Sequence, residues 1–280
     1  MSETIASTSS PISAILDLLA CPWCKARIAP SSAGLACAGC GAQFPLHDGI
    51  PDLARRGTGE TWGAADTAAS SQKYQAAYAE LHTATDYNQA YETLALKRMS
   101  TQRERNLIAR LLGAHGRVGT LLELPCGGGR LSPSFAPWTD LLLQADTGWG
   151  QLLYAKERRP PLPTPRILMS ASGFHIPFRD GSLDGVACVR LNHHLPTVEE
   201  RHRLVHELLR VARKFVLMTF FDHHSLKNRL RQRTKKRPKL TMTQTEVAAI
   251  AREHGATLVD APMLSFIGSG HRYAMMVKGA

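Results

Sequence analysis

One segment constrains the fold of this chain more than any other, the apolar run and turn at residues 120–130. The run carries Glu123 and leads straight into three consecutive glycines, from Gly127 to Gly129. A strand that passes directly into a glycine-rich turn opens a nucleotide-binding βα unit, because backbone without side chains can approach a ligand closely. The sequence therefore predicts an α/β domain with a ligand site at this turn.

The residues around the turn distinguish between two kinds of ligand. A dinucleotide site would have glycines at 127, 129 and 132, but Ser132 occupies the last of these positions. Glu123 would also repel a pyrophosphate, whereas a carboxylate there can hold an ammonium group. With Glu123, Gly127 and Gly129 in this spacing, the segment resembles the first motif of class I S-adenosylmethionine (SAM)-dependent methyltransferases. Pro125 stands where that family most often has its first glycine.

The resemblance continues downstream of the turn. Asp146 ends an apolar run 23 residues after Glu123, where the family places an acid on the ribose hydroxyls; a plain helix cap is the alternative interpretation. Ser172 and Gly173 fall at the adenine edge, without the acid that is usual there, and Arg190 lies beside the cofactor at the end of the fourth strand. The resemblance implies a Rossmann-like, seven-stranded methyltransferase sheet with helices on both faces over residues 73–280, with SAM as cofactor.

Histidines at the ends of two strands are candidates for proton transfer. Methyl transfer from a sulfonium needs a base only when the acceptor must lose a proton. His193 and His194 follow the fourth strand, and Asp222, His223 and His224 follow the fifth, at the edge where α/β sheets bind ligands. We take His194 as the candidate base; alternatively, these histidines shape the pocket or cap a helix.

Four of the six cysteines form two Cys-x-x-Cys pairs, Cys21 with Cys24 and Cys37 with Cys40, separated by twelve residues. This is the spacing of a zinc ribbon, in which two knuckles complete a tetrahedral site. Two disulfides would require an oxidising compartment, and a redox pair would not need the second copy. A closed four-thiolate site holds structural zinc and leaves no position for a substrate.

The residues around these cysteines resemble a particular small family. The pairs and the trailing segment 44–51 (FPLHDGIP) are similar to the zinc-ribbon activator of tRNA and translation-factor methyltransferases. The resemblance implies a ribbon over residues 12–54 that presents a surface to a protein partner. Residues 55–72, rich in Gly, Thr, Ala and Ser without an apolar period, are expected to be a linker.

The positive charge of the chain is concentrated in one segment. Of a net charge of +11, eight basic residues and no acid fall between Lys227 and Lys239. Such a run suggests an anionic partner, namely RNA, a phosphorylated metabolite or an anionic lipid surface; the alternative is a solvated loop. The segment lacks interleaved aromatic residues, so with RNA it would grip the backbone without stacking on bases.

Two Thr-x-x-Glu motifs predict helix starts, at Thr101 with Glu104 and at Thr197 with Glu200. Since the N-terminus lacks the basic residues of a secretory signal and no apolar run could cross a bilayer, we expect a cytoplasmic protein without a transmembrane segment. The sequence thus predicts a SAM-dependent methyltransferase acting on an anionic acceptor, either RNA or a small or lipid-like molecule. The alternative is an inactive methyltransferase fold that acts as an adaptor through its ribbon.

Overall fold

The computed structural model describes residues 11–54, 74, 76–233, 240–265 and 269–279. The expected linker at 55–72 lies outside the described residues, as do Lys235, Lys236, Arg237 and Lys239 of the basic segment. Across the described residues, no helix combines the length and apolar composition that crossing a membrane requires.

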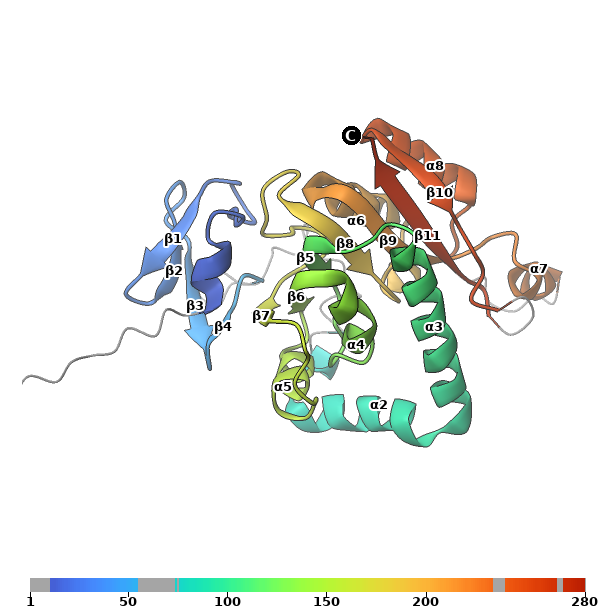
Figure 1. Cartoon of the computed structure of the whole chain (residues 1–280), viewed down its shortest axis with the longest axis horizontal. Coiled ribbons are helices and arrows are strands. Elements are labelled where there is room, and N and C mark those ends of the chain that lie inside the picture. Colours follow the sequence, from blue (N-terminus) through green and yellow to red (C-terminus); the bar gives the residue numbers. More distant parts are fainter. Residues whose placement is uncertain (1–10, 55–73, 75, 234–239, 266–268, 280) are drawn as a thin grey trace, which may run out of the picture.

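A seven-stranded mixed sheet forms the centre of the molecule (Figure 1). Its strands are β5 (Val118–Glu123), β6 (Thr139–Asp146), β7 (Arg166–Ser170), β8 (Leu183–Cys188), β9 (Ala212–Phe221), β10 (Ala256–Asp260) and β11 (His271–Lys278). The order is β10-β11-β9-β8-β5-β6-β7, and only β11 runs antiparallel to its neighbours. The predicted Rossmann-like sheet is confirmed.

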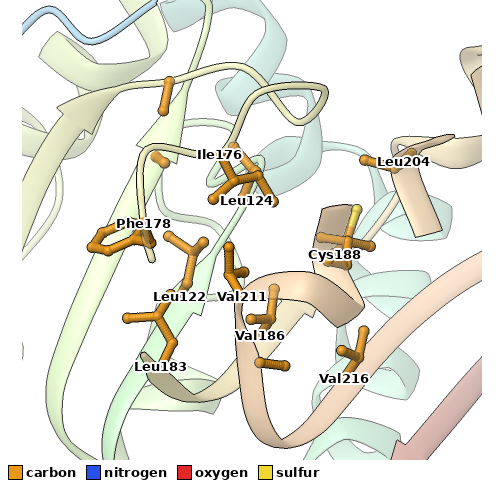
Figure 2. Close-up of a cluster of buried hydrophobic side chains, with 14 of the residues drawn as sticks. Leu122, Leu124, Ile176, Phe178, Leu183, Val186, Cys188, Leu204, Val211 and Val216 are labelled. Carbon is orange, nitrogen blue, oxygen red and sulfur yellow. The ribbon is translucent and has the colours of Figure 1, made fainter. Parts of the chain in front are cut away.

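Helices cover both faces of this sheet. They are α2 (Leu81–Thr93), α3 (Ala95–Gly113), α4 (Ser132–Phe135), α5 (Trp149–Glu157), α6 (Val198–Val211), α7 (Leu226–Arg233) and α8 (Gln244–Glu253), with short 3-10 turns η1 (Pro11–Ile15), η2 (Ala136–Trp138) and η3 (Asn192–His194). Successive residues of β5 face opposite sides. Leu121 joins the core cluster of Ile108 in α3, whereas Leu122 joins that of Leu204 in α6. Figure 2 shows the cluster of Leu122, in which Leu122 and Val186 from the sheet occur together with Leu204 of α6.

The N-terminal cysteines belong to a separate four-stranded antiparallel sheet and its flanking turns, residues 11–54, which we call the ribbon. The sheet consists of β1 (Ile28–Ser31), β2 (Gly34–Cys37), β3 (Gln43–His47) and β4 (Ile50–Pro51). Its interior is small, and several of its apolar residues, Ile15, Leu19 and Leu53 among them, belong to the same buried cluster as the α6 face of the large sheet.

The ribbon is docked on the β7 side of the large sheet (Figure 1). The backbone N–H of Leu53 donates to the carbonyl of Ser170 at 2.9 Å, and the N–H of Ala20 donates to that of Pro177 at 3.1 Å. Residues 171–182, which connect β7 to β8, contain no helix. The ribbon therefore covers a part of the sheet that this connection leaves without one.

The two predicted helix starts have different outcomes. Thr197 caps α6 with a complete capping box to Glu200, as predicted. The prediction at Thr101 is wrong, because α3 begins at Ala95 and Thr101 lies within it. Its hydroxyl donates to the carbonyl of Lys97 at 3.0 Å, the usual bond of a threonine inside a helix.

Candidate functional site

A cavity of about 340 Å³ opens at the carboxyl ends of β5 and β8. Six of the predicted site residues line it: Glu123, Gly127, Ser172, Gly173, Arg190 and His194. The volume lies within the range of small-molecule sites. The structure thus brings together residues from three separate stretches of the sequence.

Glu123 and the glycine turn form the floor of the cavity. Gly127 has φ 51° and Gly128 has φ 77°, a left-handed conformation that glycine adopts without steric cost. The Oε2 atom of Glu123 accepts hydrogen bonds from Ser132 Oγ at 2.5 Å and from Gln144 Nε2 at 3.4 Å. No donor among the described residues reaches its Oε1 atom, which leaves this oxygen for a ligand.

The protonation of Glu123 follows from its surroundings. Burial raises the pKa of its carboxyl to about 8, although Ser132, Gln144 and Arg130 act in the opposite direction. In the absence of a ligand the group therefore carries a proton near pH 7. A cationic ligand group against Oε1 would favour the ionised form.

Asp146 and Gly129 support the turn from below and are not part of the cavity wall. Oδ2 of Asp146 accepts the N–H of Gly127 at 2.8 Å, and Oδ1 accepts the N–H of Gly148 at the same distance. Burial raises the pKa of this carboxyl to about 6, although the N–H groups of Gly148 and Gly127 act in the opposite direction. Its contact with a ribose stays a prediction.

Ser172, Gly173 and Arg190 also line the cavity. Ser172 Oγ accepts the N–H of Phe174 at 3.3 Å. Arg190 has φ 68°, which is rare for a residue with a side chain, and its N–H donates to Thr219 Oγ1 at 2.7 Å. Its guanidinium points to Glu104, with 2.6 Å between Nε and Oε1.

A buried ion cluster behind the cavity was missed by the sequence reasoning. Glu104 is fully buried and pairs with Arg190 and with Arg130, whose Nη1 lies 2.5 Å from Oε2. Two guanidinium groups thus share one carboxylate, which leaves an excess positive charge at the cavity. No local motif indicates this cluster, because Arg130 and Arg190 lie 26 and 86 residues from Glu104 in the sequence.

Tyrosines form another part of the lining that the motifs did not indicate. Tyr74, Tyr78, Tyr87 and Tyr91 line the cavity, with ring centroids 4.8 to 5.3 Å apart from one tyrosine to the next. The guanidinium of Arg130 lies 4.5 Å from the centroid of the Tyr91 ring. The available signal was composition, since these are four of the six tyrosines in the chain.

The candidate base lies at the mouth of the cavity. His194 is exposed and lines the opening together with His193, at 4.1 Å between ring centroids. His193 in turn packs on Phe221, at 4.5 Å. Asp222 lies outside the lining and is paired with Arg272, and His223 and His224 also lie outside it.

The four N-terminal cysteines converge on one point. Their Sγ atoms all lie within 4.8 Å of one another, with 3.8 Å between Cys21 and Cys40 and 3.3 Å between Cys24 and Cys37. Tetrahedral zinc with bonds of about 2.3 Å would space them by about 3.8 Å. Burial opposes ionisation of Cys37, but the N–H of Cys40 and the Cys24 thiol outweigh it and lower its pKa to about 7. The donor set fits zinc.

Comparisons with known proteins agree with this architecture. Residues 122–218 match the family model described as a methyltransferase domain. The chain resembles magnesium protoporphyrin IX methyltransferase (ChlM) from Synechocystis PCC 6803 with bound S-adenosylhomocysteine (SAH), at 15% identity and a TM-score of 0.61, over 75% of this chain and 100% of that one.

It also resembles the N-methyltransferase NodS from Bradyrhizobium japonicum WM9 in complex with SAH, at 14% identity and a TM-score of 0.54, over 75% of this chain and 99% of that one. A further similar structure is the [4+2]-cyclase SpnF, at 13% identity and a TM-score of 0.50, over 63% of this chain and 80% of that one. No curated protein matches the sequence. At these identities the structures share the fold, and a shared fold does not by itself determine the reaction.

Proposed function

Because residues 122–218 carry a methyltransferase domain of the class I fold, we propose that the chain transfers a methyl group from SAM to an acceptor bound in the same cavity. The observation that carries the proposal is the combination of Glu123 Oε1 with the open glycine turn at Gly127. Structures of this fold with bound SAM or SAH support the choice of cofactor.

Each wall of the cavity has a role in this proposal. Glu123 holds the ammonium group of SAM, and the backbone at Gly127 permits close contact. Ser172 and Gly173 hold the adenine edge. Asp146 keeps the turn in place by accepting hydrogen bonds from the N–H groups of Gly127 and Gly148, and it contacts the ribose hydroxyls.

SAM supplies an electrophilic methyl group, so the protein's main task is to position the acceptor in line with it. His194, at the mouth, takes the proton of an acceptor that must lose one. The excess charge of Arg130 and Arg190 over Glu104 favours an acceptor with an anionic group, either RNA or a small or lipid-like molecule. We assign zinc to Cys21, Cys24, Cys37 and Cys40, in a structural role.

The apolar side of the ribbon lies against this chain's own sheet. A protein partner of the ribbon would therefore use its remaining surface. The second candidate function, an inactive adaptor, predicts a protein that does not bind SAM.

Binding of SAM to the purified protein, measured by calorimetry, tests the site. Gly127→Ala places a methyl group at a left-handed position that lines the cavity, and we expect binding weakened at least about tenfold. Gly181→Ala is the matched control, since Gly181 has φ 60° and open space around it but lies outside the lining. Equal affinity in the two variants would contradict the site, and no binding by the unmodified protein would favour the adaptor.

A further inference from the structure

Exposed apolar side chains and basic side chains occur together in two segments of this molecule. Among the described residues, seven large hydrophobic side chains are exposed, and five of them lie in two short segments. Segment 94–99 contributes Leu94, Leu96 and Met99, and α7 contributes Leu226 and Leu230. Both segments are basic and contain no acid.

The orientation of α7 is the reverse of that of an ordinary surface helix. It turns an asparagine inward: Asn228 is 4% exposed and its Nδ2 donates to the carbonyl of Asp222 at 2.7 Å. At 100° per residue, Leu226 and Leu230 lie on the side opposite Asn228. They are 43% and 51% exposed, on the outside of the protein.

The charges of α7 surround these leucines. Lys227, Arg229 and Arg233 are exposed, and helical geometry places them on either side of the leucine pair. A helix with leucines on its outer face and basic residues beside them is the form that lies in the interface of an anionic membrane.

Segment 94–99 repeats this chemistry at the same edge of the sheet. Here Leu96 is 81% exposed and Met99 is 53% exposed, with Lys97 and Arg98 between them. Helix α3 leads into β5 at the amino end of that strand, so the first residues of α3 lie near the edge of the sheet formed by the carboxyl ends of the strands. Strand β9 also ends at this edge, just before α7. Both segments lie on the side of the molecule away from the ribbon (Figure 1).

The cavity lies next to both segments along the chain. Tyr91, which lines it, precedes Leu94 by three residues, and His193 packs on Phe221, five residues before Leu226. We propose that α7 and segment 94–99 bind the surface of an anionic lipid bilayer. RNA fits the basic residues but not the outward leucines and methionine, because these cannot stack on bases. The inference does not depend on the chemistry of the cavity.

Co-sedimentation with vesicles tests this surface. The full-length protein should bind phosphatidylcholine vesicles containing phosphatidylglycerol and not vesicles of phosphatidylcholine alone. Leu226→Ser with Leu230→Ser, and Leu96→Ser with Met99→Ser, should each lower the partition coefficient about tenfold. Val198→Ser with Val259→Ser is the matched control and should bind normally, because these are the two large hydrophobics exposed outside the segments in the described part of the chain.

The same variants separate the possible outcomes. SAM affinity should be unchanged in all of these variants. This result distinguishes loss of vesicle binding from damage to the methyltransferase site. No binding to anionic vesicles, or equal loss in the control, would overturn the proposal. So would binding to poly(U) that depends on Arg229 and Arg233 while the leucine variants behave as the unmodified protein on vesicles.

Discussion

The ribbon and the large sheet reach a closed core by different means. The sheet has clusters on both faces, and each draws on residues of its own helices. The ribbon has little interior of its own, and its apolar residues become buried only beside four convergent thiols and against the sheet. This difference implies that a metal ligand and a buried ion pair should matter to different parts of the molecule.

The largest effect is expected at the metal site. Cys40→Ser removes an exposed ligand with little change in packing, and should abolish stoichiometric zinc and lower the free energy of unfolding by roughly 5 kcal/mol or more. Ala38→Ser, exposed between Cys37 and Cys40, is the control. Metal analysis measures the zinc content of each variant, and denaturant unfolding measures its free energy of unfolding. Equal zinc content in both variants would refute the assignment of the site.

Glu104→Gln should have the next largest effect, and on the sheet alone. It leaves the buried Arg130 and the half-buried Arg190 without their carboxylate, which costs about 3 kcal/mol. Asp180→Asn is the comparison, because it removes an ion pair with Arg210 in which the Asp180 side chain is 79% exposed. It should lower the free energy of unfolding by less than about 1 kcal/mol. Urea unfolding compares them, and zinc content should stay unchanged in both.

The pH dependence of stability tests Glu123. The pKa of its carboxyl is about 8 in the folded protein against 4.5 for the free group, so folding is favoured at low pH and this contribution is lost as pH rises through 8. Between pH 6 and 8 the loss is about 2 kcal/mol, and Glu123→Gln should abolish it.

Glu207→Gln serves as the control for this titration. Despite its burial, Arg210 and Lys25 lower the pKa of the Glu207 carboxyl, so it stays ionised over this range and its removal changes stability by a constant amount. Thermal unfolding at several pH values measures both variants without SAM. A Glu123→Gln profile parallel to that of the unmodified protein would show that this carboxyl is ionised throughout.

The smallest effect is expected at the cap of α6. Thr197→Ala removes a bond to the N–H of Glu200 and should cost about 1 kcal/mol. Thr93→Ala, near the end of α2, removes only a bond from the hydroxyl to the carbonyl of Gln89 and should be close to neutral. Neither should alter zinc content. Equal stabilities in chemical denaturation would mean that the cap contributes nothing.

The Thr-x-x-Glu motifs at Thr101 and Thr197 show how far local sequence determines structure. At Thr197 the motif precedes the apolar stripe of α6, and local hydrogen bonds are sufficient to define the start of the helix. At Thr101 the helix has already begun at Ala95, and Glu104 turns instead to Arg130 and Arg190. That partnership joins residues far apart in the chain, so the motif alone could not reveal it.

The site shows the same contrast between features set by local sequence and features set by long-range contacts. The floor was predictable, because Glu123 and Gly127 belong to one strand and its turn. The tyrosine wall and the docking of the ribbon depend on long-range packing, as the contact between Leu53 and Ser170 illustrates. No spacing in the sequence records such a contact.

Methyl transfer itself is the most direct test of the central claim. The purified protein would be incubated with methyl-labelled SAM and an extract of its own cells, and RNA, protein, lipid and small molecules would then be separated. The account predicts label in one of these fractions with the unmodified protein and with Gly181→Ala, and strongly reduced label with Gly127→Ala. SAM binding followed by no transfer to any fraction would contradict it.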